Sequence, residues 1–228
     1  DLKKGVSSIS DYAFSECNLK QINIPNSVTS IGNWSFLNCP NLKSIEIHKN
    51  IQYLGNDAFL NCNSLESVYI DSSIYFDHRM FNNKCLTKFS ILNEDSPYLS
   101  YQGSLYLKNP LTLLKYYANS KEDFKSGVVS FGSESFYSSS KTSMTFPDTV
   151  ASIESDAFLK CKELKNVNLN NVEFIGSKSF QFCVKLSFIL ITSKVNYIGE
   201  SAFENTNLSL VYIFSSNLTI EKLAFNSL

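Results

Sequence analysis

Two histidines are all that this 228-residue chain contains, which leaves little material for histidine-based catalysis or metal binding. Its 20 basic and 21 acidic side chains nearly cancel, so no positive field exists to attract nucleic acid or an anionic membrane. No apolar run approaches the ~20 residues that a membrane span requires. Glycine-rich phosphate loops, serine nucleophile elbows and paired carboxylate motifs are also missing. We therefore expect no enzyme, no cofactor and no nucleic-acid partner.

Neither a methionine nor a secretory leader opens the chain at Asp1. This predicts a piece of a longer protein, in which any membrane contact would lie in segments outside the piece. What the chain does contain is 43% hydrophobic residues, enough for a sizeable core and too many for intrinsic disorder.

The hydrophobic residues follow a repeat, which is clearest in phenylalanine. Nine phenylalanines recur at intervals of 22 or 23 residues on either side of one interruption: Phe14, Phe36, Phe59, Phe81, Phe136, Phe158, Phe180, Phe203 and Phe225. The copy "VTSIGNWSFLNCPNLKSIEI" (28–47) shows the full pattern. Its alternating end predicts a short strand, its glycine a tight turn, and the segment around the phenylalanine one or two helical turns or an irregular arc.

One copy of this length cannot bury its apolar side alone, whereas stacked copies cover one another. The sequence therefore predicts a solenoid with α/β-type coils, about nine copies of the repeat and one parallel β-sheet.

Residues 92–127 break the period. Within them, "GSLYLKNPLTLLKYY" (103–117) predicts strand, Asn-Pro turn and strand, which we interpret as a β-hairpin inserted near the middle. We expect a single domain over 1–228, with N-terminal repeats at 1–91, the inserted unit at 92–127 and C-terminal repeats at 128–228, the last one truncated. The alternative is a linker between two repeat domains, and the apolar content of the segment favours one domain.

The repeat resembles the BspA-like class of leucine-rich repeats, whose consensus is Val-x-x-Ile-Gly-x-x-Ala-Phe-x-x-Cys-x-x-Leu-x-x-Ile-x-Ile-Pro. The segment 103–117 is similar to a variant unit of that class, with Gly103, Leu105, Tyr106, Lys108, Thr112, Leu114 and Tyr117 at the matching places. The resemblance implies a surface antigen of a bacterium or protist parasite. Such a protein would adhere to host extracellular proteins or to other microbes, without enzymatic activity.

Five of the six cysteines lie three residues after a repeat phenylalanine, and Cys85 lies four after. The five are Cys17, Cys39, Cys62, Cys161 and Cys183. We interpret this as a core position filled by free thiols. Disulfides are disfavoured because stacked strands lie about 4.8 Å apart, further than the ~3.5–4.5 Å between Cβ atoms that a disulfide prefers. Metal binding is disfavoured because no Cys-x-x-Cys occurs.

Other candidate sites have simpler interpretations. His78 and Cys85 could form a Cys-His nucleophile pair, but we expect the cysteine to point into the core. His48 closes a predicted strand and is expected to be solvated on the sheet. Sequons place possible glycosylation at Asn33, Asn207 and Asn217.

Alternation along each strand sends every second side chain to the outer face of the sheet. We expect that face to bind a partner, through Glu46, His48 and Tyr69 on its polar part and through an apolar patch at its C-terminal part. The patch contains Phe188, Leu190, Leu210, Tyr212 and Phe214, rimmed by Asn168, Asn170 and Thr192. Cover by a second copy, or by another segment of the chain, would leave the same signature.

The leading functional hypothesis is a cell-surface or secreted ectodomain that binds proteins, among them host extracellular-matrix proteins. An intracellular scaffold for a signalling partner is the alternative, and a structural spacer is a third. Self-association is expected either through the apolar patch or by stacking at the C-terminal end of the solenoid.

Overall fold

The computed structural model describes residues 2–81, 85–117 and 124–226. The chain forms two compact units, Asp1–Lys108 and Asn109–Leu228, and each is described by itself. The division falls inside the segment that interrupts the repeat. Continuity of the solenoid as one domain remains a prediction.

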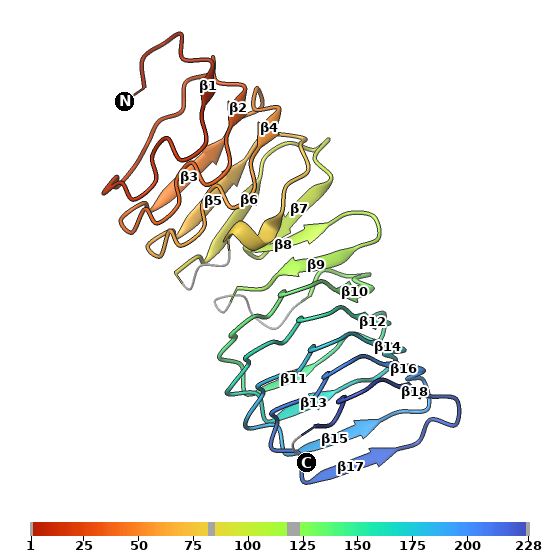
Figure 1. Ribbon diagram of the computed structural model, residues 1–228. Helices are drawn as coiled ribbons and strands as arrows, with labels where there is room; N and C mark the ends of the chain where they lie inside the picture. The colour runs from red at the N-terminus through yellow and green to blue at the C-terminus, as the bar shows by residue number, and fades with distance from the viewer. Residues whose placement is uncertain (1, 82–84, 118–123, 227–228) are drawn as a thin grey trace. The chain divides into compact units, whose positions relative to one another are not determined.

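The first unit is a stack of coils that carries two parallel sheets (Figure 1). Three four-residue strands, β3 (Ser44–Ile47), β5 (Ser67–Ile70) and β6 (Lys88–Ile91), form one sheet, with Ile45 paired to Val68 and Val68 to Phe89. Three two-residue strands form the other: β1 (Ser8–Ile9), β2 (Ser30–Ile31) and β4 (Tyr53–Leu54). A 3₁₀ turn, η1 (His78–Phe81), precedes β6.

The second unit repeats this arrangement. The strands β9 (Thr112–Lys115), β10 (Ser130–Phe131), β12 (Ser152–Ile153), β14 (Phe174–Ile175), β16 (Tyr197–Ile198) and β18 (Thr219–Ile220) follow one another in a parallel sheet. Two further parallel pairs are β11 (Ser143–Thr145) with β13 (Asn166–Asn168), and β15 (Phe188–Ile191) with β17 (Leu210–Ile213). The solenoid of 22-residue repeats is therefore confirmed.

The expectation of one sheet was wrong, because most coils contribute strands to two sheets, as one coil does with β2 and β3. The segment before the glycine is also extended: its Ser-Ile dipeptides pair with those of the next coil, as Ser8 does with Ser30. Between the two strands the chain follows an irregular arc rather than α-helix, and no α-helix occurs in the described residues. The arc closes through two left-handed residues per coil, for example Asp156 (φ 62°) and Lys160 (φ 61°).

The repeat glycines are needed because neighbouring coils approach closely at these positions, and not because the backbone is left-handed there. A Cβ atom on Gly176 would lie 2.5 Å from the backbone nitrogen of Ser155 in the preceding coil. Real Cβ atoms do not approach a backbone atom so closely, so glycine is required where one coil stacks on the next. The expected tight turn is thus replaced by a packing constraint.

The core of each unit is a column of stacked phenylalanine rings. Successive rings have centroids 4.4–5.5 Å apart and planes within 15° of parallel. The members away from the ends of each column are almost completely buried. Aromatic burial of this size supplies a large share of the hydrophobic stabilisation, so the phenylalanine register holds the coils in place.

Within the interrupting segment, strands form at both predicted places, as β8 (Ser104–Leu107) and β9. The sequence reading missed a strand before them, β7 (Tyr98–Tyr101). It pairs antiparallel with β8 around a turn at Gln102 and Gly103, both with positive φ. A Gln-Gly turn with two left-handed residues is a common hairpin connection, and this is the hairpin of the first unit.

Candidate protein-binding surface

Five exposed apolar side chains lie together on the outer face of β15 and β17. The two strands pair in register, with Phe188 opposite Leu210 and Leu190 opposite Tyr212. The rings of Phe188 and Tyr212 meet edge to face, with centroids 6.0 Å apart. Phe214 follows directly, and its N–H donates to the Ile191 carbonyl oxygen at 2.9 Å. The exposed fractions of the five side chains run from 38% at Phe188 and Leu190 to 64% at Phe214.

The predicted strand register is therefore the one that the structure shows. Between the exposed residues, Ile189 and Ile191 are fully buried. We call the five exposed residues (Phe188, Leu190, Leu210, Tyr212, Phe214) the apolar patch.

One further residue extends the exposed surface, and the sequence analysis missed it. Ile213 faces inward by alternation but is 46% exposed. Within the described residues β17 pairs only with β15, so no strand packs over its inner side chains. Ile213 lies in the last strand of the β15–β17 pair, and this position is the signal that could have predicted its exposure.

Neutral polar residues adjoin the patch along the same face. Ser143, Thr145, Asn166 and Asn168 are exposed on β11 and β13, and Thr192 is half-buried after β15. Asn170, predicted as part of the rim, is held in place because its amide nitrogen donates to the Phe146 carbonyl oxygen. A rim without charges imposes little desolvation cost on a partner that covers the patch.

The polar candidates of the first unit differ from expectation at one position. Glu46 is exposed and Tyr69 half-buried, with the Lys88 ammonium 5.8 Å from its ring centre. His48, however, is only 7% exposed. Its Nε2 donates to the Pro25 carbonyl oxygen at 3.1 Å, and its Nδ1 accepts the Asn50 N–H at 3.3 Å. The expectation that His48 is solvated was wrong, because these bonds fold its ring against the preceding coil.

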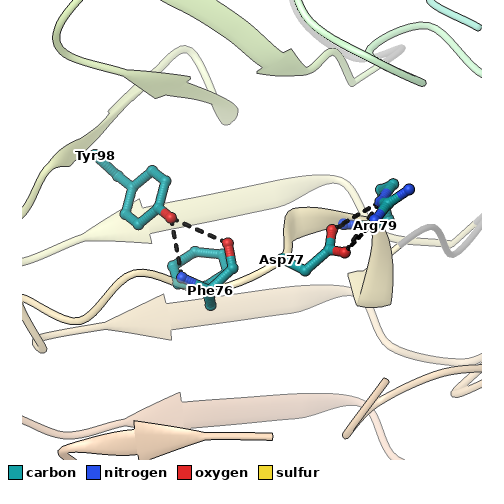
Figure 2. A network of polar contacts seen from close by, with 4 residues as sticks. All are labelled: Phe76, Asp77, Arg79 and Tyr98. Carbon is teal, nitrogen blue, oxygen red and sulfur yellow. Dashed lines mark hydrogen bonds and ion pairs between the residues drawn. The ribbon is translucent and has the colours of Figure 1, made fainter. Parts of the chain in front are cut away.

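The candidate nucleophile pair of His78 and Cys85 also differs from expectation. Cys85 is exposed rather than in the core, because its four-residue offset from Phe81 takes it out of the repeat register. His78 lies in η1, beside an ion pair of Arg79 and Asp77 at 2.6 Å that lowers the pKa of the Asp77 carboxyl (Figure 2). These contacts shape the turn and give no sign of an activated nucleophile.

Figure 2 also shows how the same turn is tied to the hairpin. The hydroxyl of Tyr98 on β7 accepts the N–H of Phe76 and donates to its carbonyl oxygen, both at 3.0 Å. Tyr98 is buried, and this burial raises the pKa of its phenol. The Tyr98 hydroxyl thus satisfies the two backbone groups of Phe76 that a neighbouring strand would otherwise bind.

The remaining cysteines are free thiols arranged in the coil register. Cys39, Cys62, Cys161 and Cys183 are buried, and Cys17 in the first coil is partly exposed. The four buried thiols donate to the carbonyl oxygen of a phenylalanine in the preceding coil at 3.0–3.3 Å. Contact with the Cys39 thiol, together with burial, raises the pKa of Cys62, and Cys161 does the same for Cys183. The protonated thiols of Cys62 and Cys183 are therefore poor nucleophiles and poor metal ligands, whereas the hydrogen bond with Cys62 lowers the pKa of Cys39 to about 7.

The three sequons are not equally accessible. The Asn33 side chain donates to Asp11 and accepts the Asn56 N–H at 2.8 Å, while Ser35 of the same sequon is fully buried. Asn207 and Asn217 are exposed. Only the last two present a free amide to a modifying enzyme, and their modification stays a prediction.

The described residues contain no group of three or more His, Cys, Asp or Glu side chains placed to hold a metal ion. None of their helices has the length and apolar character to cross a membrane.

Comparison with protein families gives the decisive result, because the family model for the BspA type leucine-rich repeat region matches residues 1–101 and 115–228 in six copies. The chain belongs to the BspA-type leucine-rich repeat family. This is a class of non-enzymatic repeat proteins, and the resemblance inferred from the sequence is confirmed. A comparison with curated proteins gave no match.

Several solved structures share the fold. A leucine-rich repeat protein from Eubacterium ventriosum has 22% identity and a TM-score of 0.76, covering 98% of this chain and 68% of its own. A leucine-rich cell surface protein from Faecalibacterium prausnitzii has 24% identity and a TM-score of 0.58, covering 94% of this chain. The present chain spans 59% of that protein. Pneumococcal vaccine antigen PcpA has 15% identity and a TM-score of 0.56, with 96% and 77% covered.

Proposed function

We propose that this BspA-type chain is a non-enzymatic, protein-binding ectodomain of a cell-surface or secreted protein, and that the apolar patch is its contact surface. The observation that carries the proposal is the pairing of Phe188 with Leu210 and of Leu190 with Tyr212, which joins exposed side chains of 38–49% exposure into one surface. Soluble proteins seldom leave such a surface bare without a binding role.

The composition of the patch favours a protein partner. Two aromatic rings in edge-to-face contact lie inside a rim of serine, threonine and asparagine, the arrangement typical of a binding hot spot. The alternating exposed and buried positions of β15 anchor the patch in the core through Ile189 and Ile191, so little ordering cost opposes binding. The surface location draws support from the family and from the cell surface protein of Faecalibacterium prausnitzii, whose fold is shared.

The test is a double variant, Phe188→Ser with Tyr212→Ser. Immobilised extracellular-matrix proteins of animal tissue are presented to the wild-type chain and to the variant, and affinities are measured by surface plasmon resonance. We expect the variant to lose at least about 2 kcal/mol of binding free energy, roughly thirtyfold in Kd. The matched control is Ser44→Ala with Ser67→Ala, two paired outer-face positions of the first unit, which should bind as the wild type does.

Folding must be checked in the same samples by urea denaturation. Because Phe188 and Tyr212 lie outside the core, the double variant should unfold at nearly the wild-type urea concentration. Equal affinity of wild type and variant for every matrix protein would contradict the proposal.

A second copy of the chain is the other candidate to cover the patch, because a contiguous exposed apolar surface can contact another copy as well as a different protein. Sedimentation equilibrium over a range of concentrations separates the two cases. A wild-type dimer that the double variant abolishes would identify the patch as a self-association surface.

A further inference from the structure

The first unit carries an aromatic pair that the fold does not require. The rings of Tyr12 and Trp34 stack with centroids 5.2 Å apart and planes 16° from parallel. Both residues have a left-handed backbone, with φ of 57° and 51°. Other coils place shorter polar residues here, such as Asp57 and Asp156, which tolerate this conformation better than bulky rings. Tyr12 is nevertheless 54% exposed, so burial does not offset the strain.

Asp11, the residue directly before Tyr12, lines a shallow groove on the outer side of β1, β2 and β4. Its volume is about 520 Å³. It is lined by Ser8, Ile9, Ser10, Asp11, Ser30, Gly32 and Tyr53. In the part of the chain that the structure describes, the hydroxyls of Ser8, Ser10 and Ser30 have no partner, and the Tyr53 ring is 51% exposed.

Hydrogen bonds hold the groove's carboxylate in a fixed orientation. Asp11 Oδ1 accepts the Asn33 N–H at 2.7 Å, and its Oδ2 accepts from Asn33 Nδ2 at 3.3 Å. Asn33 Oδ1 in turn accepts the hydroxyl of Tyr53 at 3.3 Å. Gly32 makes room for this arrangement, because a Cβ there would lie 2.5 Å from Asp11 Oδ1. The carboxylate keeps lone pairs that remain open toward the groove.

We propose that this groove, whose Asp11 directly precedes Tyr12 of the stacked pair in the chain, binds a neutral carbohydrate chain. The serine hydroxyls can donate and accept, as sugar hydroxyls do, and a fixed carboxylate can accept from two neighbouring sugar hydroxyls. Aromatic faces carry partial negative charge and attract the C–H groups of a sugar ring.

The lining argues against other ligand classes. No lysine or arginine lines the groove, and Asp11 would repel an anionic ligand, so a phosphate or acidic polysaccharide does not fit. Ile9 is the single aliphatic side chain in the lining and is itself buried, so a lipid or apolar peptide finds little to contact. The site is independent of the apolar patch, which lies in the second unit.

The chain's single tryptophan makes the test direct, because Trp34 is then the only source of tryptophan fluorescence. The wild-type chain is titrated with cello-, galacto-, manno-, xylo- and chito-oligosaccharides. We expect a saturable change of Trp34 emission with at least one of them, and calorimetry should give the same Kd.

Two variants locate the binding. Tyr12→Asn suits the left-handed backbone and Asp11→Asn keeps an acceptor for the Asn33 N–H, so both should fold. Each should weaken binding of the oligosaccharide at least tenfold. Lys178→Asn, at the equivalent left-handed position of a coil in the second unit, is the matched control and should bind as the wild type does.

Failure of every oligosaccharide to change the emission or release heat would overturn the proposal, as would wild-type affinity in both variants. Loss of oligosaccharide binding in the Phe188→Ser, Tyr212→Ser variant would also contradict it, because that variant changes only the apolar patch.

Discussion

The ring of Phe180 stacks on that of Phe203 with planes 1° apart and centroids 5.1 Å apart, and both side chains are fully buried. Columns of this kind occur in both units, and every member away from the ends is packed between the ring before it and the ring after it.

Replacing a member of the column should therefore be costly. We expect Phe180→Ala to lower the free energy of unfolding by about 3–5 kcal/mol, since it leaves a cavity between two neighbouring rings. Phe182→Ala is the control, because that side chain is exposed two residues away, and its cost should stay within about 0.5 kcal/mol. Urea denaturation measures both, and equal losses would show that the column does not dominate packing.

Within the described ranges, three serines directly before column phenylalanines are buried with no hydrogen-bond partner for the hydroxyl: Ser35, Ser135 and Ser179. Equivalent positions hold Ala58, Ala157 and Ala202. Ser179→Ala should thus stabilise the chain by about 1 kcal/mol, because an unsatisfied buried hydroxyl is costly. The reverse change, Ala157→Ser, should destabilise by a similar amount. Thermal unfolding of the two variants tests the pair, and a shift of the same sign in both would refute the explanation.

Lys115 should make the second unit sensitive to pH. Burial lowers the pKa of its ammonium to about 8, partly opposed by the charge of Glu134. An unfolded lysine has a pKa near 10.4, so between about pH 8 and pH 10.4 the unfolded chain binds more protons, and stability from this residue rises with pH.

Lys115→Met should accordingly be more stable than the wild type at pH 7, by a free energy of unfolding on the order of 2 kcal/mol. Its stability should not show the increase between about pH 8 and pH 10.4 that Lys115 gives the wild type. Stability is measured by denaturation from pH 7 to pH 10, and the difference between wild type and variant is compared across the range. Lys162→Met changes an exposed lysine and should leave the wild-type slope intact. A constant difference between wild type and Lys115→Met at all pH values would contradict the assignment.

Cys85 should react with thiol reagents faster than the buried cysteines of the coils do. In the native chain, a thiol reagent such as Ellman's reagent should react rapidly with Cys85, which is exposed, and slowly with the four buried thiols. After denaturation without reductant, Cys17, Cys39, Cys62, Cys161 and Cys183 should all react. Fewer than about five reactive thiols in the denatured sample would show that disulfides form.

Much of the fold and of the apolar patch could be predicted from the sequence. In a solenoid each copy packs mainly on its own neighbours, so the phenylalanine register already specifies which side chains meet. Strand alternation likewise placed Phe188 and Tyr212 on the outer face and Ile189 in the core, as the structure shows.

Other features depend on what the adjacent coil presents, about 22 residues away in the chain, and only the tertiary structure decided them. His48 is buried because the Pro25 carbonyl oxygen of the preceding coil accepts its hydrogen bond. Ile213 is exposed because, among the described residues, β17 pairs only with β15 and no further strand extends this pair. Gly176 is needed because the Ser155 backbone lies against it. A local pattern sets the direction of a side chain, but burial and close approach are properties of two coils at once.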